Sequence, residues 1–195
     1  MKIGFLGGSF DPVHFGHLGA AQDALAGLSL DRVELVPAAQ APLKEHAPRA
    51  SAADRLAMLR LAVEDLPGLA VSDHEIARGG VNYTIESARH FRTVYPAASL
   101  YWIIGADQFA KLPEWREAGA LAHLVEFIVL ERPGFSLGAA PDLPGLRWHR
   151  CPGRRLDLSS TALRERIRQG LALDGYMPHK AIVYLQEKRL YLPAR

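Results

Sequence analysis

The chain has 195 residues, of which 49% are hydrophobic and 23% charged, a composition that excludes a disordered or fibrous protein. Its 23 basic and 21 acidic residues leave a net charge of +2, too balanced for binding to nucleic acid or a membrane through overall charge. The single cysteine, Cys151, excludes an internal disulfide, and no apolar run reaches the roughly 20 residues of a membrane-spanning helix. We therefore expect a cytoplasmic protein without nucleic-acid or membrane partners, and the sequence leaves open whether it forms a homo-oligomer.

The first part of the chain carries a strand, a loop and a helix in succession, twice. Residues 2–6 form a short apolar run closed by two glycines, and the alanines and leucines from about His17 favour a helix. A second strand is predicted at 32–37, and Ser51 with Asp54 forms a capping box before a second helix. This alternation is typical of a parallel sheet with crossover helices.

The same alternation continues through the middle of the chain. A weaker strand signal covers residues 69–73, and Thr84 is a candidate cap for a helix that runs to Tyr95. Near-continuous apolar runs at 99–105 and 126–134 are typical of parallel strands that are covered on both faces. Between them lies a polar, helix-prone stretch that contains Trp115. Beyond about residue 146 the pattern changes to a basic segment and two helices.

The two C-terminal helices have clear boundary signals. One is predicted from about Ser160 to Gln169 with Gly170 as its stop, and the other is opened by Pro178. The fold class is therefore α/β, a Rossmann-like doubly wound parallel sheet with a C-terminal helical segment. We expect a single domain over residues 1–195, with the sheet core over about 1–150 and the C-terminal helices over about 155–195.

The loop GGSFDPVHFGH, residues 7–17, contains the least ordinary chemistry in the chain. Glycines between a strand and a helix let a phosphate approach the backbone, and the helix start offers unpaired N–H groups and a partial positive charge. The segment is neither a G-x-G-x-x-G dinucleotide fingerprint nor a P-loop. His14 and His17, three residues apart, are expected on one side of the first turn, with Gly16 leaving room for a phosphate. The alternatives are that the two histidines are ordinary polar residues at a helix start, or that they are ligands of a metal ion.

The segment GGSFDPVHFGHL resembles the H-x-G-H signature of the nucleotidyltransferase superfamily, here His14-Phe15-Gly16-His17. The superfamily's second signature, S-x-T/S-x-x-R, is matched by residues 159–164, Ser-Ser-Thr-Ala-Leu-Arg. The whole chain is similar to bacterial nicotinate-nucleotide adenylyltransferases, most closely in PAAQAPLK (37–44), NYT (82–84), WIIGADQFAKLPEW (102–115) and VLERPGF (129–135).

The resemblance implies direct attack of the 5′-phosphate of nicotinate mononucleotide on the α-phosphate of ATP, with pyrophosphate leaving together with Mg²⁺. It implies His14, His17, Lys44 and Arg164 as the catalytic residues. The ATP-binding residues that it implies are Gly7, Gly8, Ser9, Phe10, His14, His17, Gly105, Asp107, Ser159, Ser160, Thr161 and Arg164. For the nicotinate nucleotide it implies Tyr83, Thr84, Trp115 and Asp107, with Trp115 stacked on the pyridine ring. Many relatives have a histidine before the lysine, where this chain has Leu43.

Each of these residues also has an ordinary structural interpretation. Lys44 can be a solvated loop residue, Arg164 can solvate an amphipathic helix, Asp107 can cap a helix, and Trp115 can be half-buried without a ligand. The basic run 147–155 can form a rim that attracts polyphosphates. Two alternative functions stay open, a related adenylyltransferase for nicotinamide mononucleotide or phosphopantetheine, and a nucleotide-binding regulator without turnover.

Overall fold

Within the described residues, 1–40, 47–131, 138–153 and 158–192, the computed structural model contains one sheet of six strands in the order β3-β2-β1-β4-β5-β6. Every neighbouring pair is parallel. This confirms the predicted α/β fold, because the strand order is that of a doubly wound sheet whose winding reverses between β1 and β4. The strands are β1 (Lys2–Gly8), β2 (Arg32–Pro37), β3 (Leu69–Val71), β4 (Ser99–Gly105), β5 (Glu126–Leu130) and β6 (Trp148–Cys151).

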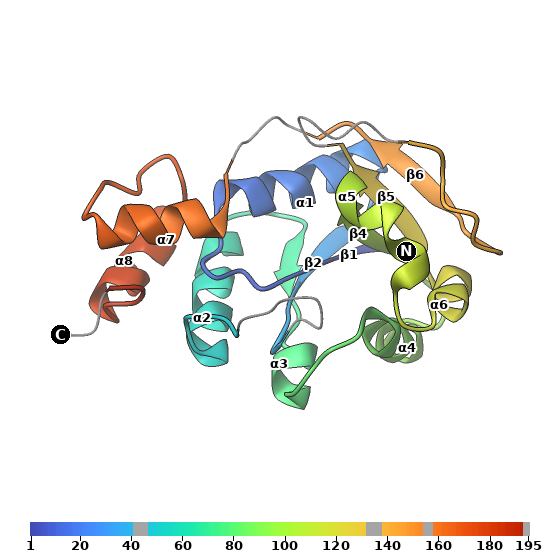
Figure 1. Ribbon diagram of the computed structural model, residues 1–195, viewed down its shortest axis with the longest axis horizontal. Coiled ribbons are helices and arrows are strands. Elements are labelled where there is room, and N and C mark those ends of the chain that lie inside the picture. Colours follow the sequence, from blue (N-terminus) through green and yellow to red (C-terminus); the bar gives the residue numbers. More distant parts are fainter. Residues whose placement is uncertain (41–46, 132–137, 154–157, 193–195) are drawn as a thin grey trace.

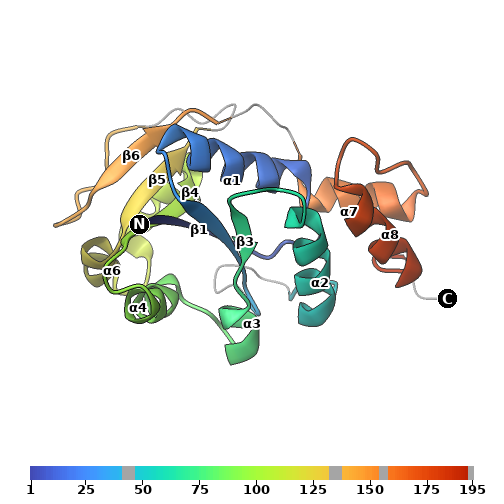
Figure 2. The same cartoon turned by 180° about the vertical axis from the view of Figure 1, so that it is seen from behind.

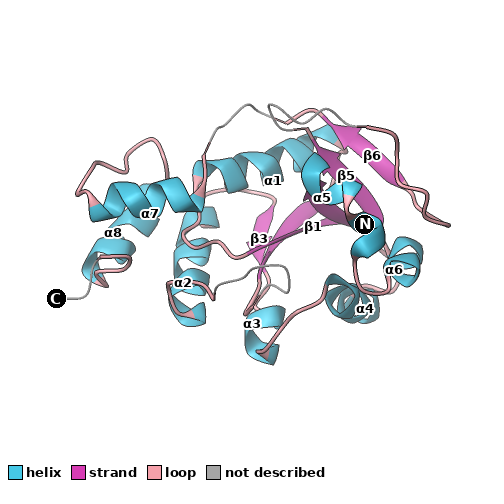
Figure 3. Cartoon of the chain, in the orientation of Figure 1, coloured by secondary structure: helices cyan, strands magenta, loops and turns pink. Residues whose placement is uncertain are grey.

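Helices cover both faces of the sheet, as Figures 1 and 2 show from opposite sides. The secondary-structure colouring of Figure 3 shows α7 and α8 beyond the β3 edge, away from β6. The helices are α1 (Phe15–Gly27), α2 (Ala52–Val63), α3 (His74–Arg78), α4 (Thr84–Val94), α5 (Ala106–Ala110), the 3-10 helix η1 (Leu112–Glu114), α6 (Ala118–Leu124), α7 (Ser160–Arg168) and α8 (His179–Glu187).

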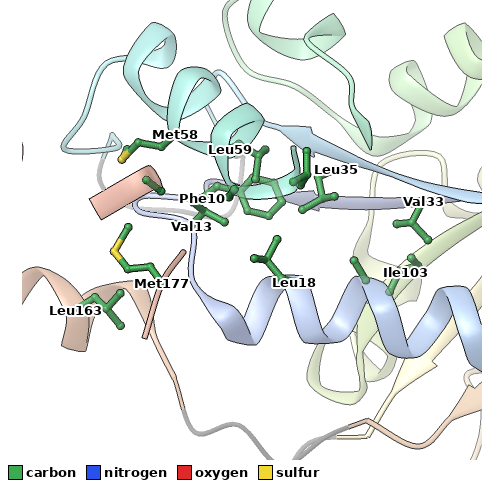
Figure 4. Close-up of a cluster of buried hydrophobic side chains, with 14 of the residues drawn as sticks. Phe10, Val13, Leu18, Val33, Leu35, Met58, Leu59, Ile103, Leu163 and Met177 are labelled. Carbon is green, nitrogen blue, oxygen red and sulfur yellow. The ribbon is translucent and has the colours of Figure 1, made fainter. Parts of the chain in front are cut away.

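Two hydrophobic clusters fill the space between the sheet and its helices. On one face, side chains such as Leu18 of α1 and Leu59 of α2 pack against Leu35 of β2. Figure 4 shows this cluster, which Leu163 and Met177 extend into the C-terminal region. On the other face α4, α5 and α6 pack on β1, β4 and β5. The C-terminal helices therefore share a core with α1 and α2.

Three predicted boundaries need correction. The first helix begins at Phe15 rather than near His17, because His14 already has the extended conformation of an N-cap. Thr84 is not the cap of α4: it is the first helical residue, and Tyr83 stands at the cap with extended backbone. The helix-prone stretch around Trp115 is broken into α5, η1 and α6, with Trp115 extended between η1 and α6.

Two elements were not predicted at all. The strand β6 lies within the basic run, where the consecutive polar residues His149 and Arg150 hide the strand signal. Helix α3 has only five residues, too few to show a period of 3.6. No helix in the described part of the chain combines the length and the apolar character needed to cross a membrane.

Candidate active site

The loop between β1 and α1 lies at the carboxyl edge of the sheet, beside the β1–β4 switch in winding. Ligands of doubly wound sheets bind at this edge. Gly7 and Gly8 end β1, and Ser9 and Phe10 follow as buried residues. Phe10 has a φ of 47°, which costs a non-glycine residue on the order of 1–3 kcal/mol. Phe10 is 1% exposed and its ring faces Gly8 and His17, so the side chain fills the core rather than facing a ligand.

His14 and His17 stack on each other, with ring centroids 3.7 Å apart and planes inclined by 22°. The backbone N–H of His14 donates to Nδ1 of His17 at 3.3 Å. In a neutral imidazole this contact puts the proton of His17 on Nε2, which makes Nε2 a donor. The structure thus brings the two histidines together on one side of the helix start, as the sequence predicts.

Gly16 is required by the stacked pair itself. A Cβ on Gly16 would lie 2.9 Å from Nδ1 and 3.0 Å from Cε1 of His14, closer than real Cβ atoms approach a ring. The same Cβ would be 3.4 Å from Cβ of Leu158, so the segment before α7 lies against this turn. Besides the predicted room for a phosphate, the His14 ring is therefore a second reason for a glycine at position 16.

The C-terminal motif meets the N-terminal loop. Arg164 donates through Nη1 to the carbonyl of Asp11 at 2.7 Å and through Nη2 to the hydroxyl of Thr161 at 3.0 Å. Ser160 donates from Oγ to the carbonyl of Pro12 at 2.9 Å. Ser159 caps α7, since its Oγ accepts from the N–H of Ala162 at 3.1 Å. The first turn of α7 is thus fixed against the loop that carries the histidines.

Arg55 of α2 connects this loop to the end of β2, a role that sequence analysis missed. Its guanidinium is 1% exposed and donates to the carbonyls of Ser9 and Ala38, both at 2.7 Å, and of Ala39 at 3.3 Å. Burial lowers the pKa of Arg55, and the nearby Asp11 carboxylate opposes that shift. Arg55 falls among leucines and alanines in the sequence, so no pattern distinguishes it from a solvated helix residue.

Asn82 extends the connection to α4. Its Oδ1 accepts from the N–H of Ala39 at 2.9 Å, and its Nδ2 donates to the carbonyls of Glu75 at 3.3 Å and Gly79 at 3.4 Å. The side chain of Asn82 is buried, and the backbone N–H of Asn82 donates to the carbonyl of Gln40. The NYT segment was the available signal, but it pointed to Tyr83 and Thr84 rather than to this asparagine. Arg55 and Asn82 together link the β1–α1 loop to the start of α4 through the backbone that follows β2.

The residues predicted for the pyridine ring gather at the start of α4. Tyr83 and Thr84 open this helix, and Arg116 stacks its guanidinium over the Tyr83 ring at 4.5 Å. Trp115 precedes Arg116 and packs on the same hydrophobic cluster as Tyr83. Nε1 of Trp115 is buried without a hydrogen-bond partner among the described residues. The geometry joins Tyr83, Thr84 and Trp115 in one region, with an unpredicted cation at Arg116.

Asp107 and Gly105 lie at the end of β4, next to β1 in the sheet. Gly105 is the N-cap of α5, so Asp107 is not a cap, and its carboxylate accepts from Nε2 of Gln108 at 3.2 Å. Lys44 and Leu43 lie outside the described residues. Within the described chain, no three His, Cys, Asp or Glu side chains are grouped so as to hold a metal ion.

The basic run 147–155 is partly neutralised where it forms β6. Arg147 and His149 lie 3.6 and 2.7 Å from Glu126, and Arg150 lies 2.6 Å from Glu131. These ion pairs reduce the positive charge that the described part of the run offers to a polyphosphate. Cys151 is buried, and burial raises the pKa of its thiol.

Comparison with known proteins finds relatives that match the full length of the chain. The cytidylyltransferase-like family model matches residues 5–166. A relative from Opitutus terrae, named "Probable nicotinate-nucleotide adenylyltransferase", is 60% identical over 195 residues, the full length of both chains. A relative of the same name from Bordetella avium is 41% identical over 200 residues and 99% of each chain. The solved structure of Plasmodium falciparum nicotinic acid mononucleotide adenylyltransferase complexed with NaAD has a TM-score of 0.77 over 97% of each chain; at 19% identity it shows the fold.

Proposed function

The chain belongs to the nicotinate-nucleotide adenylyltransferase family of cytidylyltransferase-like proteins, and we propose that it transfers the adenylyl group of ATP to nicotinate mononucleotide. The products are nicotinate adenine dinucleotide and pyrophosphate, a step of NAD biosynthesis. We propose the cytoplasm as its compartment, because ATP is available there.

The contact between the two ends of the chain carries this proposal. Arg164 and Ser160 bond to the carbonyls of Asp11 and Pro12, so the start of α7 lies against the loop of His14 and His17. Two features that bind anions, a helix N-terminus and a guanidinium, thereby meet two imidazoles at the carboxyl edge of the sheet. Such a convergence suits a triphosphate.

The reaction requires charge stabilisation more than proton transfer. The 5′-phosphate of the mononucleotide is ionised at neutral pH, so it attacks without a general base. One of its oxygens forms a bond to the α-phosphorus of ATP, in line with the bond from that phosphorus to the α–β bridging oxygen. The latter bond breaks, and the bridging oxygen leaves as part of pyrophosphate. We assign His14, His17, Arg164 and Lys44 to the stabilisation of the developing charge, His17 through its Nε2 proton.

Other residues bind and orient the two nucleotides. The N–H groups of the loop and of the first α7 turn, including Gly8, Ser9, Ser160 and Thr161, are our candidates for contacts to the ATP phosphates. Asp107, at the end of β4, is our candidate acceptor for ribose hydroxyls.

The acid form of the pyridine nucleotide suits the start of α4. The first N–H groups of a helix have no partner within it and favour a carboxylate. Thr84 is the first helical residue after the cap Tyr83, and the Arg116 guanidinium lies over the Tyr83 ring, where it brings N–H donors to the helix start although Glu86 lies 3.8 Å from it. Trp115 offers an indole face for the ring, which we assign to stacking.

We propose Mg²⁺·ATP as the form of ATP that is used. Magnesium keeps much of its water and is commonly held through substrate phosphates rather than in a cage of protein ligands. When bound, it neutralises charge on the leaving pyrophosphate. The protein's part is to hold the remaining phosphate oxygens with the groups named above.

A side-by-side assay of three acceptors tests the proposed function. The protein is incubated with Mg²⁺·ATP and nicotinate mononucleotide, nicotinamide mononucleotide or phosphopantetheine, and pyrophosphate release is measured. We expect the highest kcat/KM with nicotinate mononucleotide, because an amide cannot replace a carboxylate at a site of positive potential. A preference for either other acceptor would assign the chain to a sister activity, and release with none would leave a nucleotide-binding regulator.

A further inference from the structure

Asp11 lies at a junction of three distant segments of the chain. Its carboxylate is buried and accepts hydrogen bonds from the N–H groups of Arg49 at 2.8 Å and Ala50 at 3.0 Å. It also accepts from the hydroxyl of Tyr191, at 2.8 Å on Oδ1. One acidic side chain of the β1–α1 loop therefore joins the segment before α2 to the segment after α8.

Tyr191 reaches Asp11 from 180 positions along the chain. It follows α8 and has a φ of 65°, a left-handed backbone that turns the segment back toward the loop. Burial, together with the neighbouring negative charge of Asp11, raises the pKa of Tyr191. The hydroxyl is therefore protonated at neutral pH, which fixes it as the donor to the carboxylate.

Two guanidinium groups face the same carboxylate. Nη1 of Arg164 lies 3.8 Å from Oδ2 of Asp11, while it donates to the Asp11 carbonyl at 2.7 Å. Arg55 interacts with Asp11 electrostatically and bonds to backbone carbonyls. Oδ1 of Asp11 accepts from Ala50 and Tyr191 and Oδ2 accepts from Arg49, and these three donors already share the charge of the carboxylate.

This arrangement bears directly on the charge of Arg164. A carboxylate with one donor fewer attracts a neighbouring guanidinium more strongly, and the pair then forms a direct charge-assisted hydrogen bond. Arg164 in such a pair would be turned toward Asp11 and partly neutralised. The Tyr191 hydroxyl binds Oδ1, whereas Arg164 faces Oδ2, so the hydroxyl acts through the shared charge of the carboxylate: it weakens the attraction for Arg164, whose guanidinium stays on the Asp11 carbonyl and Thr161.

We propose that Tyr191 is a positioning residue for adenylyl transfer, which acts through Asp11 to keep the Arg164 guanidinium oriented and charged toward the ATP triphosphate. The proposal rests on the function proposed above for this site. It assigns the C-terminal end of the chain a part in ATP binding that neither signature motif contains.

The test compares Tyr191→Phe with Tyr184→Phe. Phenylalanine keeps the ring and removes only the hydroxyl. Tyr184, on α8, donates to Asp54 at 3.0 Å, so its variant loses a similar tyrosine–aspartate bond away from the loop. We expect Tyr191→Phe to lower kcat/KM for ATP about tenfold and to leave the KM for nicotinate mononucleotide unchanged. Tyr184→Phe should change neither value.

A double-mutant cycle with Arg164→Ala separates positioning from a general loss of structure. If Tyr191 acts through Arg164, then Tyr191→Phe causes no further loss in the Arg164→Ala background. Three results would each overturn the proposal. They are a loss of kcat/KM in the double variant that equals the product of the two single losses, an equal rise of KM for both substrates in Tyr191→Phe, and wild-type ATP kinetics in Tyr191→Phe.

A binding measurement keeps this test independent of turnover. The Kd of a non-hydrolysable ATP analogue is determined by calorimetry for the wild type, the two tyrosine variants and the double variant. Absence of product from the wild type would contradict the proposed function alone. The positioning role is supported if Tyr191→Phe weakens analogue binding in the wild-type background and has no effect on it in the Arg164→Ala background. Unchanged analogue binding in Tyr191→Phe overturns that role.

Discussion

Arg55 and Asn82 hold the candidate site together through backbone groups rather than through other side chains. Arg55 donates to three carbonyls and Asn82 joins the N–H of Ala39 to the carbonyl of Glu75. Sequence patterns predicted His14, His17 and Arg164 because each belongs to a short motif, residues 14–17 or 159–164, that can be read without knowledge of the fold. They could not predict Arg55 or Asn82, because the carbonyls and amides that these side chains satisfy meet only after the sheet forms.

Gly16 offers a test at the scale of a single residue. Gly16→Ala puts a Cβ 2.9 Å from Nδ1 of His14, so the ring must move out of its stack with His17. Alanine stabilises a helix by about 0.5–1 kcal/mol relative to glycine, which offsets part of the strain. We expect kcat to fall at least about tenfold while the free energy of unfolding changes by less than about 1 kcal/mol.

Gly119→Ala is the matched control for this variant. Gly119 is the second residue of α6, as Gly16 is of α1, and a Cβ on it would meet no atom within 4 Å. It should gain the same helix stability and keep wild-type kcat. Wild-type kcat in Gly16→Ala, measured beside this control, would show that the His14 position does not matter for transfer.

The elements were predictable where burial imposes a simple pattern. The strands β2 and β4 match the predicted ranges 32–37 and 99–105, because nearly every residue in them is buried. Strand β6 was missed since its polar residues His149 and Arg150 pair with Glu126 of β5 and with Glu131 directly after it, interactions that sequence periodicity does not record. The start of α4 was misplaced by one residue, because an extended backbone at Tyr83, and not the side chain of Thr84, defines the cap.

The cap of α7 provides the prediction at this scale. Ser159→Ala removes the Oγ that accepts from the N–H of Ala162, which should cost about 1 kcal/mol of stability. Because α7 carries Ser160 and Arg164, fraying of its first turn should also raise the KM for ATP. Urea unfolding and steady-state kinetics measure the two effects.

Ser51→Ala gives the reference for a lost cap elsewhere. Its Oγ caps α2 by accepting from the N–H of Asp54 at 3.1 Å, the distance found in α7. We expect a similar loss of stability with a smaller rise of the KM for ATP, because three carbonyls hold Arg55 of α2 in place when the first turn frays. An equal rise of this KM in both variants would mean that α7 has no special part in binding ATP.

At the scale of the molecule, the two ends of the chain complete one site. The sheet brings β1 and β4 together at the switch in winding, while α7 and the segment after α8 return to the β1–α1 loop. Alternating strand and helix signals predicted the sheet, and the two signatures predicted that the ends meet. The contact through Tyr191 and Asp11 was not predictable, since it depends on the left-handed turn after α8.

The turnover of His17→Ala tests the central claim that this junction transfers an adenylyl group. With Mg²⁺·ATP and nicotinate mononucleotide, kcat should fall roughly 100- to 1000-fold, the usual effect of removing a donor to a transition state. The free energy of unfolding should decrease by no more than about 2 kcal/mol, the cost of losing the bond from the His14 N–H at the helix start. A folded His17→Ala protein with kcat within about threefold of wild type would contradict the account.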